Sequence, residues 1–203
     1  MTAPEQTQRR RYESPLRRQR AAETRDRIIA AGAALAHDYA AWNWRALTVR
    51  GVAERAGVNE RTVYRYFAGE RELRDAVMHR LEGEAGIDLD ALTLENLREL
   101  TTQLLQYVST FPLEPRAPRD ATLLAAHRRQ RDALLAAVVP ATEGWSEVDR
   151  GIAAGMLDVL WSVSSYERLV ADWQLEPGDA IRGATWVIGL VEDAMRNAQR
   201  PGQ

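Results

Sequence analysis

Two arginines within residues 59–67 have the spacing needed to recognise nucleic acid. Arg61 and Arg65 are four residues apart, so in a helix they share one face, roughly opposite the apolar Val63. A guanidinium group can donate two hydrogen bonds to the edge of a guanine base, and neighbouring tyrosine hydroxyls can bond phosphate oxygens. We therefore expect this segment to form a helix whose polar face contacts DNA.

Two short helices within residues 48–67 are expected to position these arginines. Thr48 and Asn59 are residue types that cap helix N-termini, and Gly57 between them can take the positive φ at which the first helix must end. Apolar residues give each helix one buried face. They are Val49, Val52 and Ala53 in the first helix, and Val63 and Phe67 in the second. The pattern is that of a helix-turn-helix, whose second helix lies in the major groove of DNA.

The predicted DNA contacts come from polar residues of these two helices and their caps. The two arginines are assigned to bases or phosphates, whereas Thr62 and Tyr64 are expected to position the helix on the phosphate backbone. Glu60 could accept a hydrogen bond from a cytosine amino group, but a role at the positive end of the helix dipole is favoured. The full predicted set is Thr48, Arg50, Asn59, Glu60, Arg61, Thr62, Tyr64, Arg65 and Tyr66.

Residues 24–67 as a whole resemble the N-terminal domain of the tetracycline-repressor (TetR) family of bacterial transcriptional regulators. The resemblance rests on TRDRIIAAGAAL at 24–35, AERAGV at 53–58, and the string Thr62-Val63-Tyr64-Arg65-Tyr66-Phe67. It implies an all-α fold of about nine helices, in which a three-helix helix-turn-helix head precedes a helical body that binds ligand and dimerises. It also implies a repressor that a small-molecule ligand releases from a palindromic operator.

Two features depart from the family pattern. The connection between the first two helices is longer than usual and contains Trp42 and Trp44, of which we expect at least one to pack in the core. Glu70 begins the next helix at a position where many relatives carry a phosphate-binding lysine. A carboxylate suits the N-terminus of its own helix but cannot bind phosphate. Arg71 or Arg74 is the expected substitute.

The composition argues against several kinds of chemistry. The chain has no cysteine, and its three histidines, His37, His79 and His127, lack metal-ligand spacing. It contains no phosphate-binding glycine loop or nucleophile elbow, so we expect neither an enzyme nor a bound metal or cofactor. It also contains no apolar run long enough to span a membrane and no secretory signal, so we expect a cytoplasmic protein without membrane contact.

Charge is distributed unevenly along the chain. Residues 1–80 contain 16 arginines and 10 acidic residues, a net charge of +6, and residues 81–203 contain 11 arginines and 19 acidic residues, a net charge of −8. This asymmetry favours a DNA-binding head on a body that avoids DNA. The expected division is a flexible Arg-rich arm at 1–20, a DNA-binding domain at 21–84 that includes a linker helix, and a ligand-binding and dimerisation domain at 85–203.

Helical periodicity and helix-breaking residues predict the remaining elements. The first helix is expected at about 22–37, with Ile28, Ile29, Gly32 and Leu35 facing the core. After the two helices of residues 48–67, the predicted helices are 70–84, 93–110, 119–126, 128–139, 146–173 and 177–199.

The last two predicted helices carry more apolar surface than one core needs. Their apolar stripes extend over more than one side, which indicates burial on more than one side. We expect this additional apolar surface to pack against the same pair of helices from a second copy, in a four-helix interface with two-fold symmetry. A thicker core within one chain is the alternative. The predicted dimer contacts are Ile152, Val159, Val163, Ile181, Ile188 and Val191.

A ligand cavity among the body helices would be mostly apolar, with a few polar groups. The candidate lining residues, each of which could instead belong to the ordinary core, are Tyr107, Phe111, His127, Met156, Trp161 and Tyr166. The predicted partners are therefore a double-stranded DNA operator, an unidentified small-molecule effector and a second copy of the chain.

Two other functions are compatible with the sequence. One is a helical enzyme or ligand carrier that keeps a vestigial DNA-binding head, which the paired Arg61 and Arg65 disfavour. The other is a constitutive DNA-binding protein without an inducer, which a body lacking any cavity would favour.

Overall fold

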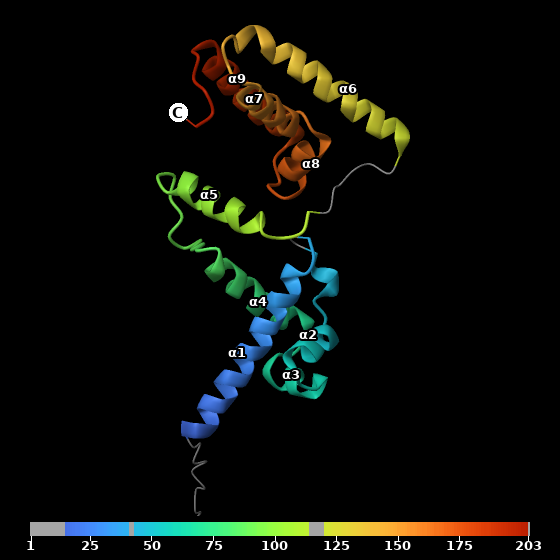
Figure 1. The fold of residues 1–203 in the computed structure, drawn as a ribbon, viewed down its shortest axis with the longest axis vertical. Coiled ribbons are helices and arrows are strands. Elements are labelled where there is room, and N and C mark those ends of the chain that lie inside the picture. The colour runs from blue at the N-terminus through green and yellow to red at the C-terminus, as the bar shows by residue number, and fades with distance from the viewer. Residues whose placement is uncertain (1–14, 41–42, 114–119, 203) are drawn as a thin grey trace, which may run out of the picture. The chain divides into compact units, whose positions relative to one another are not determined.

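The structure is a computed structural model that describes residues 15–40, 43–113 and 120–202. These residues form nine α-helices, two short 3-10 helices and no β-strand, which confirms the expected all-α fold (Figure 1). The elements are α1 (Pro15–His37), η1 (Trp44–Ala46), α2 (Val49–Ala56), α3 (Glu60–Tyr66), α4 (Glu70–Glu84), α5 (Leu97–Val108), α6 (Ala121–Val138), η2 (Val139–Ala141), α7 (Glu147–Leu160), α8 (Val163–Ala171) and α9 (Pro177–Arg196).

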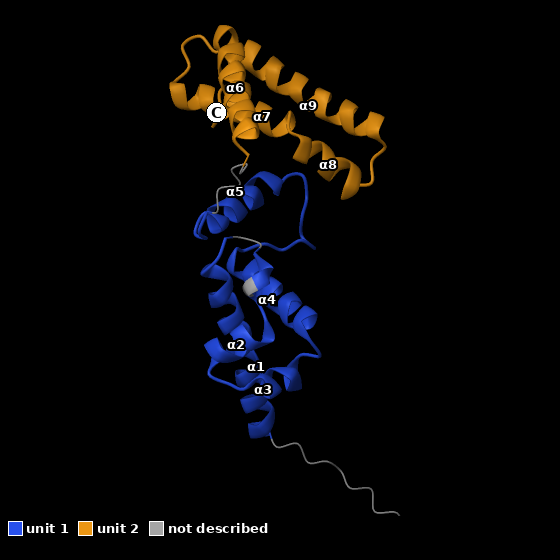
Figure 2. Cartoon of the chain, turned by 90° about the vertical axis from the view of Figure 1, so that its right-hand side faces the viewer, with its two compact units in different colours: residues 1–115 blue, residues 116–203 orange. Residues whose placement is uncertain are grey.

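The chain divides into two compact units, residues 1–115 and residues 116–203 (Figure 2). The boundary lies after α5, whereas the sequence analysis begins the second domain at residue 85. Helix α5 belongs to the first unit because its C-terminal end packs there. Phe111, just beyond the helix, is only 8% exposed within the core of this unit, and Tyr107 packs against the same core. The first unit is therefore larger than the expected domain.

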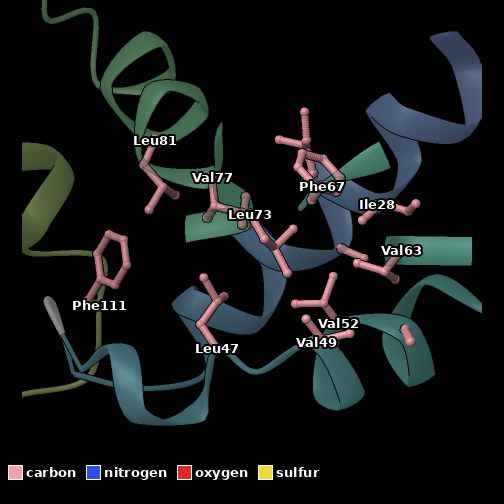
Figure 3. Close-up of a cluster of buried hydrophobic side chains, with 14 residues drawn as sticks. Ile28, Leu47, Val49, Val52, Val63, Phe67, Leu73, Val77, Leu81 and Phe111 are labelled. Carbon is pink, nitrogen blue, oxygen red and sulfur yellow. The ribbon is translucent and has the colours of Figure 1, made fainter. Parts of the chain in front are cut away.

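Helices α1 to α4 enclose one hydrophobic core (Figure 3). Helix α1 packs against α2 and α4, and α3 packs against α2. The core side chains with almost no solvent exposure include Ile28, Val52, Val63, Phe67, Leu73 and Val77. Burying an apolar side chain of this size contributes roughly 1.5–3 kcal/mol. The core therefore fixes the positions of the four helices relative to one another.

The close approach of α1 to α4 depends on a glycine. A Cβ atom on Gly32 would lie 2.5 Å from Cγ2 of Val77. Val77 is fully buried and its β-branched side chain has little rotameric freedom, so it cannot move aside cheaply. Gly32 faces the core as predicted, and any larger residue there would push the two helices apart.

Helix α1 begins earlier than the sequence analysis predicts. It spans 23 residues from Pro15, so residues 15–20 are helical with exposed side chains and do not belong to a flexible arm. Proline is well tolerated at the first position of a helix, where its missing N–H would have no partner. Pro15 therefore begins the helix and is not part of an irregular segment as predicted. The remainder of the predicted arm lies outside the described residues.

Helix α4 ends at Glu84 as predicted, but α5 begins at Leu97 and not at Thr93. Thr93 and Asn96 form a closed turn before the helix. The Thr93 N–H donates to Asn96 Oδ1 at 2.8 Å, and the Asn96 N–H donates to Thr93 Oγ1 at 3.3 Å. Such local side-chain bonds compete with helix formation and delay its start.

Helix α6 is one continuous helix of 18 residues, where two shorter helices are predicted. Asp120 caps it by accepting hydrogen bonds from the N–H groups of Thr122 and Leu123. Residues 121–138 contain no glycine or proline. The helix therefore continues through the expected break, because nothing in this segment carries a large penalty in a helix.

The helix predicted at 146–173 is in fact two helices, α7 and α8, separated at residues 161–162. Ser162 has extended backbone angles, and its hydroxyl oxygen accepts a hydrogen bond from the Ser165 N–H at 3.1 Å. It is therefore the N-cap of a new helix. The apolar periodicity continues through this serine and therefore predicts one helix, although the cap at Ser162 begins a second. Helix α9 begins at Pro177 as predicted and ends at Arg196.

The second unit has a smaller core than the first. It is formed by Val138, Trp145, Ala153, Ala154, Leu157 and Met195, with Ile188 and Val191 partly buried against it. Helix α7 packs against α6 and α9, and α8 packs against α9.

Candidate nucleic-acid interface

The structure confirms the caps and the turn of the helix-turn-helix. Thr48 Oγ1 accepts a hydrogen bond from the Gly51 N–H at 3.1 Å, and Asn59 Oδ1 accepts one from the Thr62 N–H at 2.8 Å. Gly57 between the helices has φ of 66°, in the left-handed region. Each cap contributes about 1 kcal/mol. Short-range interactions thus determine where α2 ends and α3 begins.

Helix α3 buries one face and exposes the other. Val63 and Phe67 are 0% and 1% exposed and point into the core (Figure 3). Arg61, Tyr64 and Arg65 are exposed. This is the polar face that the sequence analysis predicts, and its donors are directed away from the core that fixes the helix.

The two arginines of this face differ in their partners. Arg65 lies over the ring of Tyr66, 5.0 Å from its centroid, and its Nη2 donates to the Tyr66 hydroxyl oxygen at 3.1 Å. Arg61 has no hydrogen-bond or ion-pair partner among the described residues. Arg65 is therefore restrained beside the helix, whereas all the donors of Arg61 are available to another molecule.

The other predicted contact residues lie in the first turns of the same helices. Arg50 is exposed in the first turn of α2, and Glu60 is exposed in the first turn of α3. The carboxylate of Glu60 is therefore close to the positive end of the α3 dipole, as the favoured interpretation requires. The Thr62 hydroxyl donates to Asn59 Oδ1 at 2.9 Å, so it reinforces the cap.

A carboxylate occupies the N-terminus of α2. The Val49 N–H donates to Glu70 Oε1 at 3.3 Å, and Arg74 Nη2 donates to Glu70 Oε2 at 3.2 Å. Arg74 Nε also donates to the carbonyl oxygen of Leu47 at 3.1 Å. Glu70 therefore joins α4 to the start of α2, and it sits where a helix N-terminus could otherwise receive a phosphate. Because Arg74 is engaged within the chain, the exposed Arg71 is the better candidate for a phosphate contact.

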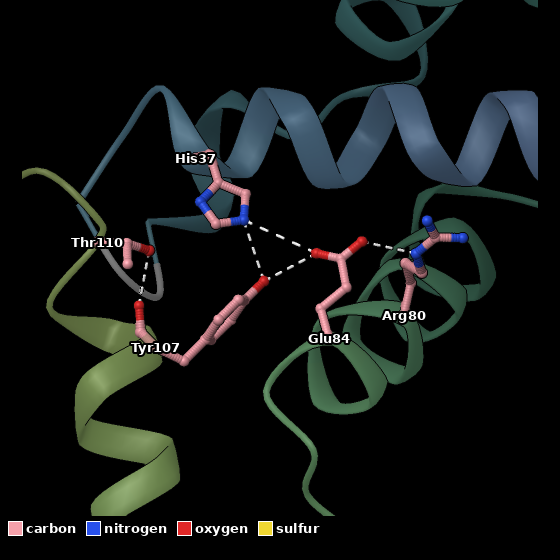
Figure 4. A network of polar contacts seen from close by, with 5 residues as sticks. All are labelled: His37, Arg80, Glu84, Tyr107 and Thr110. Atoms are coloured by element: carbon pink, nitrogen blue, oxygen red, sulfur yellow. Dashed lines mark hydrogen bonds and ion pairs between the residues drawn. The ribbon is translucent and has the colours of Figure 1, made fainter.

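A polar network joins the C-terminal ends of α1, α4 and α5 (Figure 4). The Tyr107 hydroxyl donates to Glu84 Oε2 at 2.9 Å and lies 3.0 Å from His37 Nε2. Arg80 Nε donates to Glu84 Oε1 at 2.6 Å. The His37 ring also stacks on Phe111, with centroids 4.1 Å apart. The sequence analysis missed this network, because its members are far apart in the chain and no local pattern links them.

The network shifts the pKa of two of its members. Burial raises the pKa of the Glu84 carboxyl, but the hydrogen bonds from Arg80 and Tyr107 together outweigh burial, so this pKa lies below the ordinary value of 4.5. Burial and the neighbouring Glu84 carboxylate both raise the pKa of Tyr107 above 10.0. At neutral pH Glu84 is therefore charged and Tyr107 is neutral, and these are the states in which the hydroxyl donates to the carboxylate.

Beside this network the first unit contains a cavity of about 190 Å³, which Tyr107 and Phe111 help to line. These are the two predicted pocket residues that lie at this cavity. The other four are exposed residues of the second unit and do not line it; they are His127, Met156, Trp161 and Tyr166.

The predicted dimer contacts fall into two groups. Ile152, Val159, Val163 and Ile181 are exposed on α7, α8 and α9. Ile188 and Val191 instead pack against the core of the second unit, because they lie on the side of α9 that faces α7. The first group is therefore the more exposed of the two.

Among the described residues, no group of three or more histidine, aspartate or glutamate side chains is placed to hold a metal ion. Within the same part of the chain, no helix is long and apolar enough to cross a bilayer.

The capped helices, the left-handed glycine turn and the exposed arginines define the class of the first unit, a helix-turn-helix DNA-binding domain. Comparison with family models finds a match within this unit. Residues 28–77, from α1 to α4, match the model described as bacterial regulatory proteins, tetR family. Residues 28–77 are therefore a DNA-binding domain of the TetR type. No curated protein and no solved structure matches the chain.

Proposed function

We propose that the chain is a transcriptional repressor that binds a pseudo-palindromic operator as a homodimer, with α3 of each copy in the major groove. Two-fold symmetry would place the two recognition helices about 34 Å apart, one turn of DNA. A small-molecule effector releases the operator by binding more tightly to a form of the dimer whose recognition helices do not fit DNA.

The exposed face of α3 carries this proposal. Its arginines and Tyr64 project from a helix whose opposite face is anchored by Val63 and Phe67, so their orientation is set before DNA is met. Arginine pairs bidentately with O6 and N7 of guanine, and the available donors of Arg61 suit such a base contact. Arg65, restrained by Tyr66, suits a contact at one fixed position on the duplex.

The apolar surface of the second unit supports the homodimer. Large apolar side chains are exposed along α7, α8 and α9, and they include Ile152, Met156, Val159, Trp161, Val163, Ile181, Trp186 and Leu190. A continuous apolar helix face is normally covered in the functional molecule. A second copy offers the same face, so a two-fold arrangement covers both.

The test begins with selection of DNA from a library of random duplexes by the full-length protein. We expect enrichment of a pseudo-palindromic sequence with half-sites about one helical turn apart. In fluorescence anisotropy with that sequence, Arg61→Ala should weaken binding by about 1–3 kcal/mol.

The matched control is Arg168→Ala, which removes the same group from α8, where the side chain is 77% exposed. Operator affinity should not change in this variant. Failure to enrich any sequence, or equal losses in the two variants at one salt concentration, would contradict the assignment of α3 as the recognition helix.

A further inference from the structure

The cavity of the first unit lies where α1, α4 and α5 meet the connection between α1 and α2. Its walls include Leu35 of α1, Leu81 of α4, Leu104 of α5, and Trp44 and Leu47 of the connection. Its volume is about 190 Å³, and none of its described lining residues comes from the recognition helix α3. A ligand in this cavity would therefore not cover the face that is proposed to contact DNA.

The lining is apolar and aromatic. Asn43 and Glu82 are its amide and carboxyl residues, and none of its described members is basic. An apolar cavity of about 150 Å³ holds a benzene molecule, so this one holds a single ring with one or two small substituents. An anionic ligand would lose its hydration without gaining a cationic partner, and it would also meet the charge of Glu82. The lining therefore selects a neutral, mainly apolar molecule.

The cavity reaches the surface of the first unit. Two of its lining residues, Tyr39 and Leu89, are 38% and 64% exposed. Another lining residue, Leu47, is 2% exposed and belongs to the core of the head. A ligand can thus enter beside the exposed residues and reach the core without unfolding of the helices.

One wall of the cavity is directly connected to the helix-turn-helix. Leu47 immediately precedes Thr48, the N-cap of α2, and its N–H donates to the Trp44 carbonyl oxygen at 3.1 Å. Its own carbonyl oxygen accepts from Arg74 of α4 at 3.1 Å. A ligand that displaces Leu47 would therefore disturb both the start of α2 and its attachment to α4.

Another lining residue, Tyr107, connects the cavity to α4 and α1. Its ring lines the cavity, and its hydroxyl donates to Glu84 of α4 and lies beside His37 of α1. Movement of this ring would change contacts at the ends of both helices. Leu47 and Tyr107 thus give a ligand two physical routes to a different arrangement of the head.

We propose that this cavity is the effector site, and that the effector is a neutral, mainly apolar molecule the size of one substituted ring. Its regulatory role rests on the proposed function, whereas binding of the ligand does not require DNA. The described residues that line the site all belong to the first unit.

Ligand binding is tested by ligand-observed NMR on the full-length protein with benzyl alcohol and toluene as probes and benzoate as the charged counterpart. We expect both neutral probes to bind and benzoate to bind at least about tenfold more weakly. Leu104→Trp should fill the cavity and weaken probe binding by at least about tenfold. The matched control is Leu105→Trp, because Leu105 is 59% exposed on the same helix and does not line the cavity.

If Leu104→Trp does not fold, as judged by circular dichroism, Val108→Phe fills the same cavity from one turn further along α5. The proposal is overturned if neither neutral probe binds the wild type at millimolar concentration. It is also overturned if a folded cavity-filling variant binds the probes as tightly as the wild type.

The effector role is then tested with the selected operator. Saturating benzyl alcohol should lower operator affinity about tenfold, within the usual range for coupled sites, in the wild type and in Leu105→Trp but not in Leu104→Trp. Probe binding without any change in operator affinity would overturn the effector role and leave the DNA-binding function intact. Absence of specific DNA binding would instead overturn the proposed function, while the NMR experiment would still report on the cavity.

Discussion

The two units of the chain use apolar residues in opposite ways. Among helices α1 to α4 of the first unit most large apolar side chains lie inside, and Ile28 and Phe67 are 0% and 1% exposed. In the second unit small residues such as Ala153 and Ala154 occupy the core, while Met156 and Trp161 are 50% and 61% exposed. Helices α1 to α4 thus bury most of their large apolar side chains within one chain, whereas α7 to α9 of the second unit leave many of theirs exposed.

This difference matches the tasks that we assign to the two units. Side chains that read DNA must be fixed precisely enough for their donors to meet base edges, so the recognition helix needs a core of its own. A surface that associates with a second copy must instead stay open within each chain. A change at a buried position of the first unit should therefore affect folding, and a change at an exposed position of the second should affect assembly.

The largest effect is expected from Phe67→Ala in the core of the first unit. Loss of a fully buried phenyl ring typically lowers the free energy of unfolding by about 3–5 kcal/mol. The control is Tyr64→Ala on the same helix, where the ring is 54% exposed and the change should stay within about 0.5 kcal/mol. Urea unfolding measures both, and similar losses would contradict the inward orientation of Phe67.

Met156→Asp should break the assembly and leave the protomer folded. An unpaired charge in an apolar interface should weaken the dimer by about 3 kcal/mol, which analytical ultracentrifugation can detect as monomer. Ala125→Asp adds the same charge at an exposed position of α6 and should leave the dimer intact. Ile188→Asp should instead unfold the second unit, because Ile188 packs on its core. A stable Met156→Asp dimer would place the interface elsewhere.

Glu84→Gln should weaken the attachment of α5 to the first unit in a pH-dependent way. The folded-state pKa of Glu84 lies below 4.5, so its stabilising contribution is fully present above about pH 4.5 and is lost as the pH falls through that lowered pKa. We expect the variant to be about 1 kcal/mol less stable near neutral pH and the difference to shrink in acid. Glu99→Gln, at an exposed position of α5, should show neither effect in urea unfolding across this range.

The smallest effect is expected from Glu70→Gln. The amide oxygen can still accept from the Val49 N–H, but the negative charge at the start of α2 is gone. Operator affinity should rise by roughly 0.5–1 kcal/mol, the usual size of a charge effect at a helix end. Glu54→Gln removes the same charge from an exposed position later in α2 and should raise affinity less. Equal gains in operator affinity for the two variants would mean that only the net charge of the protein, and not the position of Glu70, affects DNA binding.

The parts of the fold that sequence reasoning predicts correctly are those determined within a few residues. The Thr48 and Asn59 caps and the turn at Gly57 each depend on neighbours in the chain, and all three are confirmed. The expectation that at least one tryptophan of the long connection packs in the core is also confirmed, because Trp44 packs against the head. Trp42 lies outside the described residues.

The errors arise where two local signals compete or where the partner is distant. Apolar periodicity outweighed the cap at Ser162, so one helix was predicted where two form. Glu70 accepts a hydrogen bond from the backbone N–H of Val49, which lies 21 residues earlier in the chain. The Tyr107 hydroxyl contacts His37, which lies 70 residues earlier. Such pairs depend on how helices pack, and helical periodicity alone contains no information about them. Tyr107 and Phe111 are predicted pocket residues and do line the cavity, but its walls from α1, α4 and the connection between α1 and α2 were not predicted, for the same reason.

The internal pairing of Arg74 also bears on how operator binding responds to ionic strength. Each protein cation that neutralises a DNA phosphate releases condensed counterions, which makes log K fall with log salt by about 0.9 per contact. Arg74 is already neutralised by Glu70, so it releases none. Although the first 80 residues contain 16 arginines, the salt dependence should therefore follow the few exposed ones near α2 and α3, such as Arg50, Arg61 and Arg71.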